Sequence, residues 1–459
     1  MLIKKGIQFS VIETDNTELL SALQNLYTFP IKNAVFSNAY KRGHWDGKKR
    51  FISHKGIFRT GLLPYILNDL ERIGCYPEIE LCYNEAPTVP IKQIKNLVYY
   101  DYQEQAIEKI LAVKRGIIKA PTASGKTLIL AGLLESIYTP NAKIILLYTA
   151  TQLLVQTYEF LKNMTTIPSI GVNFGQNYQD GDIMLTTVQS IEKVLDSHLE
   201  DAIGLFVDEC HEYSTGETFL AAVNSFPDAQ YRIGFTGTVP SEDIPKYNIF
   251  GALGEVIEVA GTQELIRKKK LAKPIIQILD RTDFALSGME DASYRDIYNA
   301  CVVNNEARNK QIARIVSFIK STKEDAKILI LVKSLRHGNI LKDLLGGNCI
   351  YLEGKDSIMD RYKEIDRFRK AKDPIPLVAT KILQTGIDIK EITHFINARG
   401  MKSEIAVLQA LGRSLRPQEE DAIVYVYDFK DGEKYLLDHS KKRIRYYKKE
   451  GHAIKVIKC

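Results

Sequence analysis

The sequence predicts an α/β protein in which two tandem parallel-sheet domains follow a small α+β domain. Short apolar strands alternate with amphipathic helices, the alternation breaks at residues 265–274, and a new series starts at residues 327–332. The segment at the break is basic and ends in a proline, which is typical of a linker. We therefore expect four parts: residues 1–92, 93–262, 263–430 and a basic C-terminal tail, 431–459.

The first series contains apolar strands at residues 117–118, 144–148, 183–186 and 205–207. A helix with apolar residues at helical spacing is expected over residues 151–161, after the second of these strands. This order of short strands and helices predicts a parallel sheet with helices on both faces.

The composition fits a folded protein of more than one domain. The chain has 459 residues, 45% of them hydrophobic, and 62 Lys and Arg against 56 Asp and Glu. The net charge of +6 permits a polyanionic partner. No apolar run reaches the length of a membrane span, and the six cysteines lack C-x-x-C spacing. We expect a cytoplasmic protein with free thiols and no membrane partner.

A phosphate-binding loop is predicted where the 117–118 strand leads into an apolar helix. Backbone N–H groups at a helix start point at a phosphate, and Gly125 lets the backbone approach closely. Lys126 would reach the β- and γ-phosphates of ATP, and the Thr127 hydroxyl would hold Mg²⁺. The loop consists of Ala120, Pro121, Thr122, Ala123, Ser124, Gly125, Lys126 and Thr127, with Ala120 replacing the first glycine of the usual pattern.

A second acidic segment follows the 205–207 strand. Asp208 would orient the Mg²⁺, and Glu209 would act as the general base that deprotonates the attacking water. His211 has two interpretations. It is a structural histidine, or it senses the γ-phosphate and couples it to the other domain.

The second series carries a segment in which Gln409, Arg413 and Arg416 share one helical face. Two arginines on one face would clamp a γ-phosphate. Surface arginines at such spacing are usually solvated, so the residues alone leave both interpretations open.

The N-terminal part interleaves basic and aromatic residues around expected turns at Gly43 and Gly47. In one interpretation the basic side chains bind phosphates and Trp45 stacks on or wedges a base. In the other, Trp45 anchors a small core and the lysines are merely solvated. The basic run at residues 441–449 is likewise a helix on the duplex or a solvated end. The basic residues concerned are Lys41, Arg42, Lys48, Lys49 and Arg50.

The order of these segments resembles that of the superfamily 2 helicases. The resemblance implies two RecA-like motor domains whose arginines close on ATP, with Arg416 as the arginine finger. Tyr102 and Gln103 resemble the adenine-reading motif, with Tyr100 where many relatives have arginine. The family further implies nucleotide contacts from Gly386 and Asp388, backbone grip by Thr187, Lys333 and Thr380, and coupling of hydrolysis to strand binding by His211, Thr236 and Thr238.

The N-terminal G-x-W-D-G and G-L-L-P segments are similar to those of phage branch-migration helicases of the UvsW type. This similarity implies an ATP-dependent DNA helicase that remodels Holliday junctions, forks, D-loops and R-loops in recombination, repair and replication, acting in the host cytoplasm. Two alternatives stay open: an RNA helicase, since phosphate contacts do not report a 2′-hydroxyl, and a duplex DNA translocase without unwinding.

Overall fold

The computed structural model describes most of the chain, and its residues fall into two compact units. The first unit is Met1–Ala120 with Gly125–Val259, and the second is Ala260–Cys459 with Pro121–Ser124. The described residues are 1–95, 97–121, 124–192, 194, 202–213, 217–282, 292–346, 349–353, 356, 358–380, 391–401 and 422–458.

The first unit begins with a small mixed sheet. Among the described residues its strand order is β5-β2-β1-β6, with β1 antiparallel to β2 and parallel to β6. Helices α1 (Thr17–Leu26) and α3 (Leu63–Arg72) pack against it through residues such as Leu23 and Ile66. The strands are β1 (Leu2–Lys5), β2 (Phe9–Glu13), β5 (Ile57–Arg59) and β6 (Glu78–Leu81).

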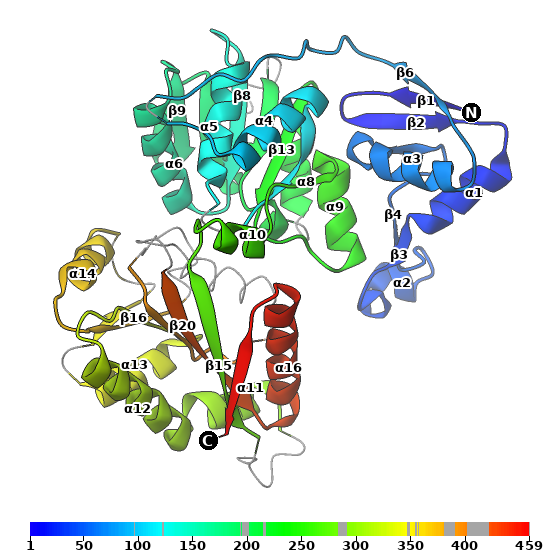
Figure 1. Cartoon of the computed structure of the whole chain (residues 1–459). Helices are drawn as coiled ribbons and strands as arrows, with labels where there is room; N and C mark the ends of the chain where they lie inside the picture. Colours follow the sequence, from blue (N-terminus) through cyan, green and yellow to red (C-terminus); the bar gives the residue numbers. More distant parts are fainter. Residues whose placement is uncertain are drawn as a thin grey trace. The chain divides into compact units, whose positions relative to one another are not determined.

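A separate small element is inserted between α1 and β5 (Figure 1). It comprises residues 28–50, and we call it the excursion. Its two strands pair antiparallel, and the Ile31 N–H donates to the Gly47 carbonyl at 2.8 Å. Gly43 and Gly47 have φ of +69° and +76°, so the predicted turns lie at these glycines. The excursion consists of β3 (Thr28–Pro30), a 3₁₀ turn η1 (Ala34–Phe36), α2 (Asn38–Lys41) and β4 (Lys48–Arg50).

The larger sheet of the first unit has, over the described residues, the order β10-β9-β11-β8-β12-β13-β7-β14. All its pairs are parallel except β9 with β10. The strands are β7 (Arg115–Lys119), β8 (Lys143–Tyr148), β9 (Ile170–Phe174), β10 (Asn177–Gln179), β11 (Ile183–Thr187), β12 (Ala202–Val207), β13 (Tyr231–Thr236) and β14 (Val256–Glu258). The helices are α4 (Asp101–Val113), α5 (Lys126–Ile137), α6 (Thr151–Met164), α8 (Glu217–Asn224) and α9 (Asp243–Leu253). The four predicted strands and the predicted helix of the first series are therefore confirmed.

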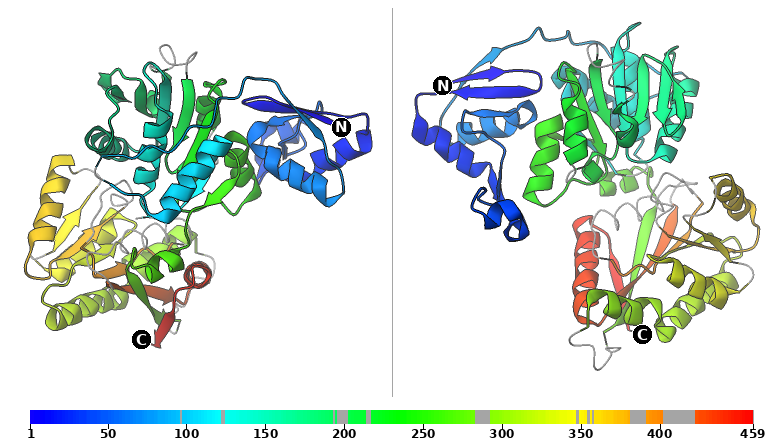
Figure 2. Two further views of the ribbon diagram at one scale, coloured as in Figure 1. Left: turned by 45° about the horizontal axis from the view of Figure 1, so that its top comes forward. Right: turned by 180° about the vertical axis from the view of Figure 1, so that it is seen from behind.

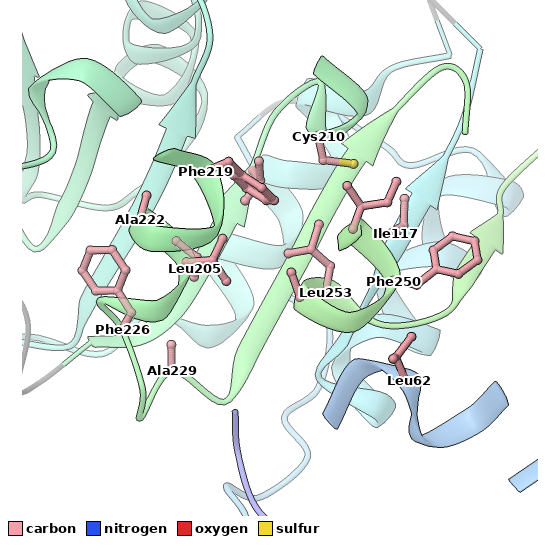
Figure 3. Packing of buried hydrophobic residues seen from close by; sticks show 14 of the residues in the cluster. Leu62, Ile117, Leu205, Cys210, Phe219, Ala222, Phe226, Ala229, Phe250 and Leu253 are labelled. Carbon is pink, nitrogen blue, oxygen red and sulfur yellow. The ribbon is translucent and has the colours of Figure 1, made fainter. Parts of the chain in front are cut away.

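The two sheets of the first unit share one apolar cluster (Figure 3). Leu62, in the turn before α3, is buried with Phe250 and Leu253 of α9. A Cβ on Gly61 would lie 2.6 Å from the Gly251 carbonyl oxygen, so the two backbones are in direct contact there. Residues 1–92 therefore do not form a compact unit of their own.

The second unit is built on a parallel sheet with the order β17-β18-β16-β19-β20-β15-β21 in the described part of the chain. Helices α12 and α13 pack together over one side and α16 lies on the other (Figure 2). The strands are β15 (Lys273–Arg281), β16 (Ile328–Leu331), β17 (Ile350–Leu352), β18 (Pro376–Ala379), β19 (His394–Asn397), β20 (Ile423–Asp431) and β21 (Ile454–Lys458). The helices are α10 (Thr262–Arg267), α11 (Tyr294–Tyr298), α12 (Glu306–Thr322), α13 (Leu335–Leu345), α14 (Ile358–Lys370) and α16 (Lys434–Lys449).

Two sequence expectations about this unit are wrong. Residues 431–459 are not a separate tail, because α16 packs on β20 and β21 pairs with β15. The basic run at residues 441–449 indicated an exposed chain end, but Arg443 and Tyr447 within it are buried, at 1% and 0% exposed. The segment at 265–274 is not a free linker either: Leu265 is buried in α10, and Lys273 starts β15.

Every helix in the described part of the chain is too short or too polar to span a bilayer.

Candidate functional site

The predicted phosphate loop lies at the end of β7 and is anchored to the neighbouring strand β13. The Ala120 N–H donates to the Thr236 carbonyl at 3.0 Å. Gly125 has a φ of +84° and precedes α5, so the chain reverses there into the helix start. Lys126 Nζ donates to the Ala120 carbonyl at 3.2 Å, which holds the ammonium over the mouth of the loop. Thr127 is exposed, whereas Thr122 and Ala123 lie outside the described residues.

Gln103 and Tyr102 lie beside this loop, at the start of α4. The Gln103 side chain is buried and its Oε1 accepts the Tyr100 N–H at 3.0 Å, so it caps the helix. A Cβ on Gly125 would collide with Gln103 Nε2. Glycine is therefore needed at residue 125 both for its backbone conformation and for the space that Gln103 occupies.

The acidic segment follows β12, two strands away from β7 in the sheet order. The Asp208 N–H donates to the Leu147 carbonyl of β8 at 3.0 Å, and Asp208 Oδ1 accepts the Glu209 N–H at 3.0 Å. Glu209 has a φ of +44°, a conformation that few residues other than glycine adopt. Burial and the neighbouring Glu209 charge raise the pKa of Asp208, while the Lys126 charge lowers it.

His211 connects the acidic segment to β13. Its Nδ1 lies 2.8 Å from Thr236 Oγ1 and 3.4 Å from Glu209 Oε2. Thr236 Oγ1 in turn donates to the Thr238 carbonyl at 2.6 Å. Burial lowers the pKa of His211, so the neutral imidazole is favoured. His211 thus belongs to a buried polar chain that runs from Glu209 to Thr238.

Two groups in this chain have unused hydrogen-bonding capacity. In the described part of the molecule, Glu209 Oε2 and Thr238 Oγ1 are buried and have no hydrogen-bond partner. Cys210, between Glu209 and His211, is fully buried against Gly234 and serves as a small filler. Buried polar atoms without partners at strand ends are typical of a site that a ligand completes.

The residues expected to grip nucleic acid have different surroundings. Thr187 ends β11, is 6% exposed, and its hydroxyl donates to Ser190 Oγ at 3.0 Å. Lys333 Nζ lies 4.7 Å from the centre of the Tyr298 ring, and Thr380 follows β18 at intermediate exposure. The grip by these three residues stays a prediction.

The predicted N-terminal basic residues lie on the excursion, and all five are exposed. Trp45 is partly buried and its indole N–H donates to the Lys48 carbonyl at 3.1 Å, so it supports the turn. It does not belong to an apolar cluster of the described residues. Arg50 forms an ion pair with Asp46.

The remaining predicted site residues lie outside the described residues. They are Gly386, Asp388, Gln409, Arg413 and Arg416.

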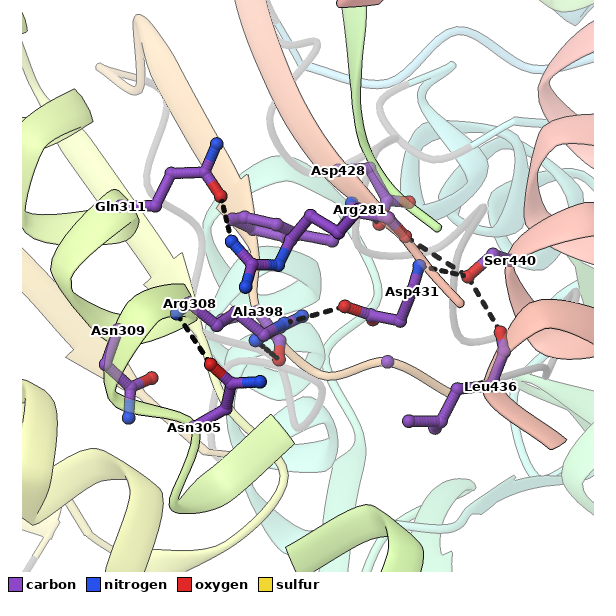
Figure 4. Close-up of polar contacts among 12 residues, drawn as sticks. Arg281, Asn305, Arg308, Asn309, Gln311, Ala398, Asp428, Asp431, Leu436 and Ser440 are labelled. Carbon is purple, nitrogen blue, oxygen red and sulfur yellow. Dashed lines mark hydrogen bonds and ion pairs between the residues drawn. The ribbon is translucent and has the colours of Figure 1, made fainter. Parts of the chain in front are cut away.

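A buried network that the sequence did not indicate borders the 402–421 segment in the second unit. Arg443 of α16 donates through Nη1 to the Met401 carbonyl at 2.9 Å and through Nη2 to the Phe429 carbonyl at 2.6 Å. Its Nε lies 3.0 Å from Asp428 Oδ2. Arg308 pairs with Asp431 at 3.1 Å and donates to the Ala398 carbonyl (Figure 4). The charges of α12 and α16 therefore hold the chain on both sides of the segment that carries Gln409, Arg413 and Arg416.

Comparisons with known proteins agree with this architecture. The family described as "Type III restriction enzyme, res subunit" matches residues 96–241, and the "Helicase conserved C-terminal domain" matches residues 308–418. The chain is similar to the ATP-dependent DNA helicase uvsW of Enterobacteria phage T4, with 24% identity over 96% of each chain. It is also similar to the DNA 3'-5' translocase XPB2 of Sulfurisphaera tokodaii, with 22% identity over 87% of this chain and 95% of that protein. The structure of S. cerevisiae Dbp5 bound to RNA and ADP BeF3 covers 78% of this chain and 89% of its own, with a TM-score of 0.58 and 15% identity.

Proposed function

Since the chain belongs to the superfamily 2 helicases, we propose that it is an ATP-dependent DNA helicase that remodels branched DNA. ATP hydrolysis and action on nucleic acid come with the family. The finer proposal is that Holliday junctions, forks, D-loops and R-loops are its substrates, in recombination, repair and replication. The observation that carries the ATPase assignment is that three neighbouring strands of one sheet lead into the residues concerned: β7 into the loop before Lys126, β12 into Asp208, and β13 into its last residue, Thr236.

The residues at these strand ends fit ATP and Mg²⁺. Asp208 has a raised pKa because its charge is poorly compensated, and Glu209 Oε2 is buried without a hydrogen-bond partner in the described chain. Both features are what a bound cation with its water shell relieves. Asp208 and Thr127 would hold Mg²⁺, which would neutralise the charge that develops on the phosphates.

The remaining roles are those that the family resemblance implies. Lys126 would move from the Ala120 carbonyl to the phosphates, because both are acceptors and the phosphates carry more charge. Glu209 would orient and deprotonate the attacking water. Tyr102 and Gln103 would contact the adenine, and Gly386, Asp388, Gln409, Arg413 and Arg416 would complete the nucleotide site.

His211, Thr236 and Thr238 would couple hydrolysis to strand movement. Hydrogen bonds join His211 to Thr236 and Thr236 to the Thr238 carbonyl, and Glu209 Oε2 lies 3.4 Å from His211 Nδ1, so a change at the γ-phosphate that moves Glu209 would alter the hydrogen bonds beyond β13. The same strand leads toward α9, on which the N-terminal sheet packs. Coupling through this chain therefore reaches the part of the molecule that carries the excursion.

DNA as the substrate is supported by the names of two relatives and by the exposed lysines and arginines of the excursion. Phosphate contacts of this kind hold a backbone without reading its sequence. We therefore expect little sequence preference and a strong dependence of binding on salt.

The test is ATP hydrolysis in the presence of matched lengths of single-stranded DNA, duplex DNA, a four-way junction or RNA, with strand displacement followed on the junction. We expect the junction to stimulate hydrolysis most strongly and its strands to separate. Stimulation by RNA alone would make the protein an RNA helicase. Equal stimulation by every DNA without strand separation would make it a duplex translocase.

A further inference from the structure

The excursion exposes apolar side chains in the turn η1 that follows β3, and we call this turn the tip. Phe36 is 73% exposed and Val35 is 52% exposed, both in the turn η1. Within residues 28–50, Ala34 and Gly47 are the buried residues, so this element has almost no core of its own. Phe36 and Val35 thus present adjacent apolar side chains to solvent at the tip.

The tip is held rigidly although it lacks a core. The Tyr40 ring lies 3.0 Å from the position of a Cβ on Gly47, and the Ser37 hydroxyl accepts the Tyr40 N–H at the start of α2. Trp45 closes the turn through its bond to the Lys48 carbonyl. Trp45 therefore stabilises the turn of the excursion, whereas the Phe36 side chain is exposed to solvent.

The base of the excursion is attached to α9 of the larger sheet's helical layer. The Phe29 ring stacks on Tyr247 with centroids 4.9 Å apart, and Phe51 lies 5.6 Å from the same ring. Lys32 forms an ion pair with Glu242, at the start of α9, at 2.6 Å. A movement of α9 would therefore carry the tip with it instead of bending a hinge.

The excursion that carries Phe36 is positively charged. Lys41, Arg42, Lys48 and Lys49 are exposed, and none of them forms an ion pair within the residues that the structure describes. Asp46, the acidic residue of the excursion, is already paired with Arg50. An exposed aromatic side chain on an element that also carries unpaired, exposed cations matches a base next to phosphates.

We propose that Phe36, supported by Val35, is the wedge that separates strands, and that it stacks on the exposed face of the last base pair at a DNA branch point. Lys41, Arg42, Lys48 and Lys49 then hold the phosphates of the two departing strands. A wedge separates strands only if it moves with the motor, and the Phe29–Tyr247 stack and the Lys32–Glu242 pair provide this attachment. This inference rests on the proposed DNA helicase function.

The test compares Phe36→Ala with Tyr76→Ala as a matched control. Tyr76 is 76% exposed in the same unit but is followed by Glu78 and Glu80 in place of cations. Strand displacement on a forked duplex and ATP hydrolysis with single-stranded DNA are measured for both. We expect Phe36→Ala to separate roughly tenfold fewer base pairs per ATP hydrolysed, the loss that corresponds to about 1.4 kcal/mol of stacking. Tyr76→Ala should match the wild type.

A second readout places 2-aminopurine at the branch point and measures its fluorescence on binding without ATP. Wild type and Phe36→Trp should change the emission, and Phe36→Ala should not. The proposal that Phe36 is the wedge would be overturned if Phe36→Ala separated as many base pairs per ATP as the wild type. It would also be overturned if Phe36→Ala changed the 2-aminopurine emission as much as the wild type does. A wild-type protein that hydrolyses ATP with RNA alone would instead overturn the proposed function, so the two failures are distinct.

Discussion

The acidic residues of the two large sheets have different surroundings: Asp208 and Glu209 follow β12 and are partly buried, whereas Asp428 lies within β20 and is 1% exposed. In the first unit, Asp208 and Glu209 lie next to each other, and their charge is left largely uncompensated by the protein. In the second unit, Asp428 accepts hydrogen bonds from Arg443, from the Tyr447 hydroxyl at 2.9 Å and from Asn397 Nδ2 at 3.1 Å.

The difference separates a site for a ligand from a structural site. Two adjacent carboxylates with little compensating charge are suited to an external cation, whereas a carboxylate whose partners come from its own domain contributes to the fold. Burial alone lowers the pKa of Arg443, but the charge and hydrogen bonds of Asp428 more than offset this and raise it above its usual value. The similar topology of the two sheets therefore does not imply a similar role for their acidic residues.

The largest effect is expected for Lys126→Ala, which removes the phosphate-binding ammonium of the first unit. ATP hydrolysis should fall to background while folding survives, because Lys126 makes a hydrogen bond to only a loop carbonyl in the described chain. The control is Lys119→Ala, since Lys119 ends β7, the strand before the loop, but pairs with Glu258. Appreciable DNA-stimulated hydrolysis by the Lys126 variant would contradict the site assignment.

Glu209→Gln should slow ATP turnover by roughly 10²–10⁴-fold, the contribution of a positioned general base. Binding of ATP and DNA should persist, because the amide keeps the shape of the side chain. The matched change is Glu212→Gln, at an exposed residue of the same segment. A normal turnover rate in Glu209→Gln, measured in single-turnover experiments, removes Glu209 from the role of base.

Arg443→Met tests the structural carboxylate of the second unit. It leaves Asp428 buried and unpaired by charge, so the free energy of unfolding should fall by about 3–5 kcal/mol in urea titrations. The double variant Arg443→Met with Asp428→Leu removes both charges and should recover part of this loss. If the double variant is as unstable as the sum of the single changes, the two residues are not coupled.

Thr236→Val removes the hydroxyl that joins His211 to Thr238. Stimulation of hydrolysis by DNA should fall several-fold more than hydrolysis without DNA, because the change interrupts the chain of hydrogen bonds without touching the phosphate loop's side chains. Thr236→Ser keeps the hydroxyl at this residue and serves as the comparison. Equal losses with and without DNA would mean that the chain has only a structural role.

The smallest effect concerns the stability of the second unit at mildly acidic pH. Burial, with a contribution from Arg308, lowers the pKa of His337 to about 3, and its Nε2 donates to Asn309 Oδ1 at 3.0 Å. In the unfolded chain His337 takes up a proton as the pH falls below about 6.5, whereas in the folded chain it stays neutral. The free energy of unfolding therefore falls as the pH falls below that value. Between pH 7 and pH 5 the loss should be about 2 kcal/mol.

His337→Gln should flatten this part of the curve of unfolding free energy against pH. A slope that stays the same in the variant would show that His337 is not the titrating group. His394, whose pKa burial lowers to about 4, is then the group to change next.

The positions of the predicted phosphate loop and of the acidic segment could be inferred from sequence because each is a local pattern that follows a strand. Gln103 at the loop and the Glu209–His211–Thr236 chain needed the structure, since they join residues that only the sheet brings together. The error over residues 431–459 has the same origin. Nine residues with six Lys or Arg look solvated, yet Arg443 among them is buried because Asp428 lies opposite it.

The sequence by itself determined the α/β class and the positions of the predicted loop and acidic segment directly after strands, because hydrophobic periodicity and short motifs are local in the chain. The tertiary structure decided which buried polar groups of the described chain have hydrogen-bond partners and which, such as Glu209 Oε2, do not. It also decided that the N-terminal sheet shares a core with α9, and that Phe36, not Trp45, is the side chain held out in water. Burial and pairing depend on partners that are distant in sequence, so no local pattern specifies them.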